Sequence, residues 1–125
     1  PTDNASELTA RINDEGWDSS FSNWLKVSKL SSKDCLFFFS VGGGNLKKKI
    51  SVNLIQAAKL AQKKNCKIIS IVGRDDGYLA NNSDQSLIIP MVNKNNITPQ
   101  SEAFQAVIWH LLVSHPKVKE NNTKW

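Results

Sequence analysis

The sequence predicts an α/β fold in which a mainly parallel, doubly wound sheet carries helices on both faces. Three short apolar runs are typical of buried strands, and they lie at residues 35–40, 66–72 and 86–90. Residues 42–44, Gly73 and Pro90 end these runs, as expected where strands pass into loops. Between the first two runs, apolar residues recur at helical spacing over residues 50–64. Strand, helix and strand in this order predict parallel pairing.

Further helices are predicted at both ends of this unit. Residues 6–12 and 17–27 are expected to form two short helices before the first strand. A final helix is expected to begin at Thr98, which can cap it, with Pro99 in its first position, and to end near Ser114. Sheets of this type usually have about five or six strands, whereas only three are found. The fold is therefore expected to lack its N-terminal strand and helix.

Length and composition predict one soluble domain. The 125 residues are 40% hydrophobic, which suffices for a single core. Residues 1–116 are expected to form this partial domain and residues 117–125 a polar tail. No apolar run reaches membrane-spanning length and no signal-peptide pattern is found, so a cytoplasmic protein without a membrane partner is expected. Cys35 and Cys66 each open an apolar run, which predicts two buried thiols.

The charge pattern does not favour a nucleic-acid partner. The net charge is +5, but the lysines are scattered and the only arginines are Arg11 and Arg74. Nucleic-acid-binding domains instead gather their basic residues on one face or along one helix. An anionic small substrate suits the same charge.

The glycine-rich loop at residues 40–45 is the main candidate binding site. A Gly-rich turn between a strand and a helix leaves backbone amides open toward the helix N-terminus, which favours a phosphate group. The candidate phosphate-binding residues are Ser40, Val41, Gly42, Gly43, Gly44 and Asn45. Neither the P-loop nor the dinucleotide-binding spacing is present, and a tight turn without a ligand is the alternative. A Gly43→Asp substitution is expected to abolish phosphate binding and to leave the fold intact.

Four segments in order resemble the SIS (sugar isomerase) family. Residues 40–45 occupy the place of its phosphate loop, and residues 71–77 resemble the strand-to-loop segment that follows. Residues 98–102, with His110 eight residues after Glu102, resemble the terminal helix of sedoheptulose 7-phosphate (phosphoheptose) isomerases. Residues 12–17 resemble the Asn-Asp-aromatic-Gly segment of the same enzymes.

This resemblance implies an aldose-ketose isomerase that acts on a sugar phosphate and uses zinc. It implies that Asn13 and Asp14 contact sugar hydroxyls in the same cleft as the loop. It also implies that Glu102, where the family has a glutamine, and His110 contribute to substrate binding and to a zinc site, with His110 as the catalytic acid or base. From the residues alone, a helix-ending turn is the alternative for Asn13 and Asp14, and a core position is the alternative for His110.

Two departures from the family pattern limit what this chain can do alone. Gly42 and Asn45 stand where the family has phosphate-binding serines. The family's first strand, its loop, and a helix with a zinc-binding His and a catalytic Glu have no counterpart in the sequence. The resemblance therefore implies a C-terminal portion with half of the site, inactive by itself and assembled as a homo-oligomer, a dimer or tetramer. A non-catalytic SIS module that binds a sugar phosphate and regulates a protein partner is the alternative.

Overall fold

The sheet has three parallel strands, as the sequence predicted. The computed structural model describes residues 4–122. The strands are β1 (Cys35–Ser40), β2 (Lys67–Val72) and β3 (Gln85–Ile88), in the order β1-β2-β3. Phe39 of β1 lies opposite Ile71 of β2, and Ile71 lies opposite Leu87 of β3. All three carboxyl ends therefore meet at one edge of the sheet.

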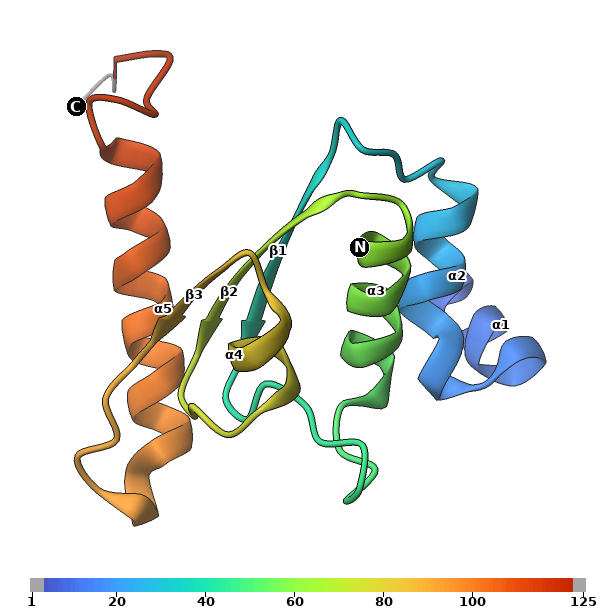
Figure 1. The fold of residues 1–125 in the computed structure, drawn as a ribbon, viewed down its shortest axis with the longest axis horizontal. Coiled ribbons are helices and arrows are strands. Elements are labelled where there is room, and N and C mark those ends of the chain that lie inside the picture. The colour runs from blue at the N-terminus through green and yellow to red at the C-terminus, as the bar shows by residue number, and fades with distance from the viewer. Residues whose placement is uncertain (1–3, 123–125) are drawn as a thin grey trace.

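Helices cover both faces of this sheet, which confirms the doubly wound α/β class. One side carries α1 (Ala5–Glu15), the 3-10 turn η1 (Trp17–Ser19), α2 (Ser20–Val27), α3 (Val52–Lys63) and α4 (Tyr78–Asn82). A 3-10 turn, η2 (Lys94–Asn96), leads into α5 (Ile97–Ser114), which lies alone on the other side (Figure 1). Within residues 4–122, no helix combines the length and apolarity needed to cross a membrane. The short helix α4 was not predicted.

The core lies between the sheet and α3. Phe38, Ile68 and Val72 point to this side from the strands, and Leu25 and Leu79 join them from α2 and α4. The buried face of α3 consists of small residues, namely Ala57, Ala58 and Ala61. Small side chains let a helix approach a sheet closely, so large strand residues fill the remaining space. The helical spacing seen in the sequence and the burial of Cys66 are both confirmed.

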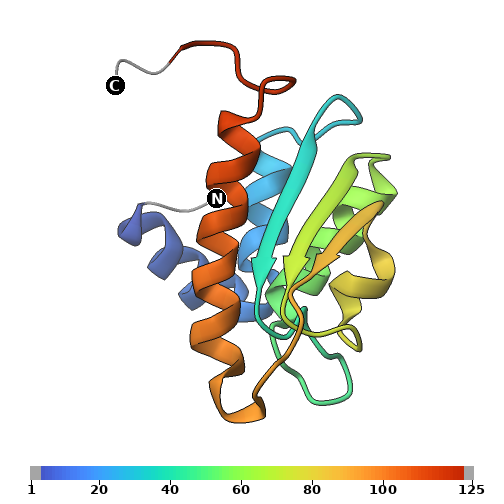
Figure 2. The same ribbon diagram turned by 90° about the vertical axis from the view of Figure 1, so that its left-hand side faces the viewer.

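Strand β1 is buried on one face only, and the prediction of burial on both faces was wrong. Phe37 and Phe39 each keep 40% of their surface exposed, and Cys35 is exposed rather than buried. The reason is positional: β1 is the outer strand of the sheet, next to β2 only. Helix α5 lies on this face and packs against β2, and Figure 2 shows it displaced past β1. Phe37 and Phe39 are therefore only partly covered by the described residues.

Two helices begin at residues other than those predicted. The turn η2 is capped by the Asn93 side chain, which accepts a hydrogen bond from the Asn95 amide at 2.9 Å. This turn runs directly into α5, so Thr98 lies inside the helix and does not cap it. Pro99 takes the third helical position, which is tolerated because amides of the first turn need no helical acceptor. Helix α3 begins only at Val52, after a tight turn over residues 45–50.

Candidate functional site

The glycine loop, residues 40–45, lies at the carboxyl end of β1 and is held by its own carbonyl groups. The Val41 carbonyl accepts the Gly73 amide at 2.9 Å, which continues the pairing with β2. The Gly43 and Gly44 carbonyls accept the amides of Leu79 and Tyr78 at 2.9 and 2.8 Å. These bonds cap the N-terminus of α4. The loop is therefore fixed between the end of β2 and the start of α4.

Gly43 and Gly44 are needed for conformation and for space. Their φ angles of 68° and 82° lie in the left-handed region that favours glycine. A Cβ at Gly44 would also come within 2.8 Å of the Ile55 side chain. Gly43→Asp would therefore strain the backbone of the loop, and the expectation that this variant keeps its fold stays a prediction. Gly42 differs, because a Cβ there would meet nothing within 4 Å.

The loop keeps several hydrogen-bond donors free. The Ser40 hydroxyl accepts the Gly43 amide at 3.0 Å and still has its own proton to donate. The Asn45 carboxamide oxygen accepts the Lys48 amide at 3.0 Å, which leaves its NH₂ group available. The Gly42 and Gly44 amides meet no acceptor among residues 4–122. Donors of three kinds thus occur at the edge where ligands of parallel α/β sheets bind.

A tight turn separates the loop from α3. Asn45 and Ile50 exchange two backbone hydrogen bonds, of 2.9 and 3.0 Å, and close a turn that carries Lys47, Lys48 and Lys49. The pKa of the Asp76 carboxyl lies below its usual value, chiefly because Arg74 donates hydrogen bonds of 2.8 and 2.9 Å to it, and to a smaller degree because Lys48 is nearby. The lysine turn, rather than a helix dipole, therefore supplies positive charge beside the loop.

Two buried polar residues that sequence reasoning missed attach α5 to β2. Ser101 is buried against Gly73, where an added Cβ would overlap its hydroxyl. Gln105, one turn later, donates from its amide to the Ile71 carbonyl at 3.0 Å. Their spacing of four residues, which places both on one side of the helix, was the available signal. Together they bring the first turns of α5 to the carboxyl end of the sheet.

Glu102 lies close to this end, whereas His110 lies farther along α5. Glu102 lines a hollow of about 510 Å³ together with Phe37, Phe39 and Trp109. His110 is exposed and stacks on Trp109, with 3.7 Å between the ring centroids. Eight residues separate Glu102 from His110, about 12 Å of helical rise. Within residues 4–122, no three His, Cys, Asp or Glu side chains gather closely enough to hold a metal ion. Glu102 and His110 can therefore supply at most two ligands to a metal ion.

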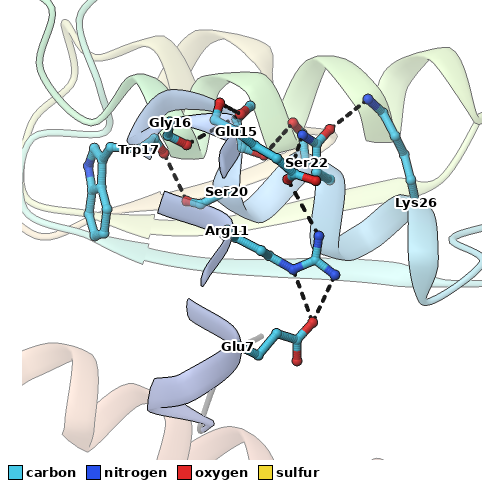
Figure 3. Close-up of polar contacts among 10 residues, drawn as sticks. Glu7, Arg11, Glu15, Gly16, Trp17, Ser20, Ser22 and Lys26 are labelled. Atoms are coloured by element: carbon cyan, nitrogen blue, oxygen red, sulfur yellow. Dashed lines mark hydrogen bonds and ion pairs between the residues drawn. The ribbon is translucent and has the colours of Figure 1, made fainter. Parts of the chain in front are cut away.

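Asn13 and Asp14 lie near the end of α1, where both are exposed and Asn13 donates to the Asp14 carboxylate at 2.8 Å. A polar network ties α1 to α2 (Figure 3). In it Arg11 bonds Glu7 at 2.8 Å, and the Asn23 side chain donates to the Glu15 carboxylate at 2.8 Å. Helix α1 packs against η1 and α2. That Asn13 and Asp14 share a cleft with the glycine loop stays a prediction.

Several of the known proteins that the chain matches in sequence are phosphoheptose isomerases. No family model matches the chain. It is 36% identical over 107 residues to a phosphoheptose isomerase of Helicobacter hepaticus, covering 86% of this chain and 49% of that protein. It is 31% identical over 118 residues to the lincomycin biosynthesis protein LmbN of Streptomyces lincolnensis, covering 90% of this chain and 41% of that protein.

The fold agrees with these relatives. A phosphoheptose isomerase from Francisella tularensis superposes with a TM-score of 0.68 at 21% identity, over 87% of this chain and 55% of that one. The chain thus spans about half the length of the proteins it matches. By sequence and by fold, the chain is similar to about half of a phosphoheptose isomerase.

Proposed function

We propose that the chain supplies the phosphate-binding part of an isomerase that interconverts an aldose and a ketose phosphate, with sedoheptulose 7-phosphate as the substrate type. The observation that carries this proposal is the glycine loop. It presents free donors from Ser40, Gly42 and Asn45 at the carboxyl end of β1. Backbone amides together with nearby lysine charge suit a phosphate group. The phosphoheptose isomerases that match the chain support the choice of sugar phosphate.

The chemistry of this reaction assigns roles to two residues of α5. Aldose-ketose interconversion needs a group that moves a proton beside the carbonyl, and histidine is the side chain best suited to this near neutral pH. We assign that role to His110. If zinc is bound, Glu102 and His110 are the ligands that this chain would offer. The ion would stabilise the negative charge that develops on the substrate oxygen. Since two ligands do not complete a site, we expect no turnover from the 125 residues alone.

We also propose that the protein forms homo-oligomers in the cytoplasm. Phe104, Val107 and Leu111 form an apolar stripe on α5, the α5 stripe, with exposed fractions of 50%, 61% and 60%. Their spacing of three and four residues puts them on one side of the helix. Exposed apolar patches of this kind mark interaction surfaces. The exposed free thiol of Cys35 fits a reducing compartment.

The binding proposal is tested with the 125-residue chain itself. Sedoheptulose 7-phosphate is titrated into ¹⁵N-labelled protein, and the amide resonances of Gly42, Gly44 and Asn45 are expected to shift. Gly42→Asp places a carboxylate in open space beside the loop and is expected to weaken binding at least tenfold. Ser32→Asp, an exposed position before β1, is the control with the same charge change and should bind as the unchanged chain does. Equal affinity of the two variants would remove the loop from the site.

A non-catalytic sugar-phosphate sensor is the second candidate. The observation that favours it is the exposed position of His110, stacked on Trp109 and about 12 Å of helical rise from Glu102. The two candidates differ in turnover. A protein of the relatives' full length that carries these residues is incubated with sedoheptulose 7-phosphate and zinc, and NMR follows the aldose product. Product formation that falls at least about a hundredfold in His110→Ala supports the isomerase, whereas binding without product supports the sensor.

A further inference from the structure

The turn at residues 45–50 is a closed extension of the glycine loop. Asn45 and Ile50 join its two ends with backbone hydrogen bonds of 2.9 and 3.0 Å. Inside the turn, the Asn45 side-chain oxygen accepts the Lys48 amide at 3.0 Å. Asn45 therefore belongs to both structures, since its oxygen holds the turn while its NH₂ group remains free at the loop.

The segment that precedes α4 lies directly on the glycine loop. A Cβ at Gly77 would overlap the Gly42 carbonyl oxygen. Figure 1 shows this segment and the turn at the same end of the sheet. The hydrogen bonds from Arg74 are the main cause that lowers the pKa of Asp76, and the charge of Lys48 contributes to the lowering. The ammonium group of Lys48 is therefore on the side of the turn that faces the glycine loop.

The Lys48 ammonium group has no carboxylate partner of its own. The ion pairs within residues 4–122 involve Arg11, Lys67 and Arg74, and none of them includes Lys48. Asp76 is already bonded through both carboxylate oxygens by Arg74, at 2.8 and 2.9 Å. The charge of Lys48 is thus available to an anion beside the loop.

We infer that Lys48 is a further substrate-binding residue, whose ammonium group binds the phosphate of the sugar phosphate together with the donors of the glycine loop. The inference rests on the proposed function and adds a charged donor to that site. Gly42 and Asn45 stand where the resembled family has serines, so the loop offers fewer hydroxyl donors. A phosphate monoester carries a charge of about −1.5 to −2 at pH 7, and a charge-assisted hydrogen bond is roughly twice as strong as a neutral one. One ammonium group can therefore offset the missing neutral donors.

Charge removal at two neighbouring positions of the turn tests this role. Sedoheptulose 7-phosphate is titrated into the ¹⁵N-labelled 125-residue chain and into three variants, and the amide resonances of Gly42 and Asn45 report the affinity. Lys48→Gln is expected to weaken binding at least about tenfold, and Lys48→Arg, which keeps the charge, less than about threefold. Lys47→Gln removes the same charge one position earlier and is expected to weaken binding less than about threefold, because only the general potential changes. Both lysines are exposed, and circular dichroism verifies that the variants fold.

A second readout observes the contact itself. In chain labelled with ¹³C-lysine, the Cε resonance of Lys48 is assigned by its absence from Lys48→Arg, and it is expected to shift on titration. Equal affinities of Lys48→Gln and Lys47→Gln, or an unshifted Lys48 resonance in the bound chain, would overturn the inference. In both cases shifts of the loop amides in the unchanged chain would leave the proposed function standing. An unchanged chain that does not bind the sugar phosphate would overturn both.

Discussion

Gly73 is a residue whose lack of a side chain lets α5 lie directly on the sheet. It follows β2, and its amide bonds the Val41 carbonyl at 2.9 Å. A Cβ there would overlap the Ser101 hydroxyl and come within 3.2 Å of the Val41 carbonyl oxygen. Since Ser101 is buried, its side chain has little room to move away. The contact places the first turns of α5, and with them Glu102, beside the glycine loop.

We therefore expect Gly73→Ala to lower the free energy of unfolding by about 1–3 kcal/mol, the usual cost of overpacking. Urea denaturation measures the loss. Gly42→Ala, with open space around the added methyl group, is the matched control and should change stability much less. The double variant Gly73→Ala/Ser101→Gly should recover part of the loss. Equal unfolding midpoints for Gly73→Ala and Gly42→Ala would show that the close approach of α5 is not required.

At the scale of elements, Asp84 joins the starts of β2 and β3. Its carboxylate accepts the Ile68 amide at 2.9 Å and the Lys67 ammonium group at 2.7 Å. The Lys67 hydrogen bond is the main cause that lowers the pKa of Asp84, and the Ile68 amide is the next. A carboxyl group whose pKa is lower in the folded state stabilises the fold when ionised. The contribution is complete above the unfolded pKa of about 4 and is lost as the pH falls through the lower folded value.

Asp84→Asn should therefore be less stable than the unchanged chain at pH 7, and this difference should shrink as the pH falls below about 4. Urea midpoints at pH 7, 5 and 3 measure it. Asp18→Asn, an exposed position in η1, is the control and should show no such dependence. A stability difference between Asp84→Asn and the unchanged chain that is constant from pH 7 to 3 would contradict the role given to the carboxylate.

Elements with a local signal could be predicted from the sequence, and those set by neighbours could not. The alanine face of α3 follows from residue spacing alone, and so does the parallel strand–helix–strand order. The exposure of Phe37 and Phe39 depends on what lies beside β1, which no local pattern encodes. The start of α5 was misplaced because η2 carries the cap upstream of Thr98.

In the candidate site too, features with a local sequence signal were predicted and features that depend on distant contacts were not. Residues 40–45 were found because a glycine run after an apolar strand is a local signal. That Ser40 accepts the Gly43 amide, and that the loop carbonyls cap α4, depends on contacts distant in sequence. Ser101 and Gln105 were missed because their partners, Gly73 and the Ile71 carbonyl, lie on another element. The roles of Glu102 and His110 come from family resemblance, and their function stays a prediction.

At the scale of the whole molecule, α5 has two apolar sides with different consequences. One side carries Trp109 and Val113, which line the hollow next to β1. The opposite side is the α5 stripe. A helix that is apolar on both sides is normally buried on both sides. The α5 stripe has no partner among residues 4–122, so a second copy of the chain is the expected contact.

The chain should therefore elute as a dimer or larger species, with a mass that light scattering measures. Val107→Glu/Leu111→Glu places two charges on the α5 stripe and should shift the protein to the monomer mass, because burying unpaired carboxylates is costly. The matched control is Val27→Glu/Val118→Glu, which adds the same charges at exposed positions outside α5 and should keep the oligomer. Hydrogen exchange at β1 should not change in either variant, since β1 lies on the other side of α5 from the stripe. A monomeric unchanged chain, or an oligomer that survives both charges on the α5 stripe, would show that this surface does not mediate self-association.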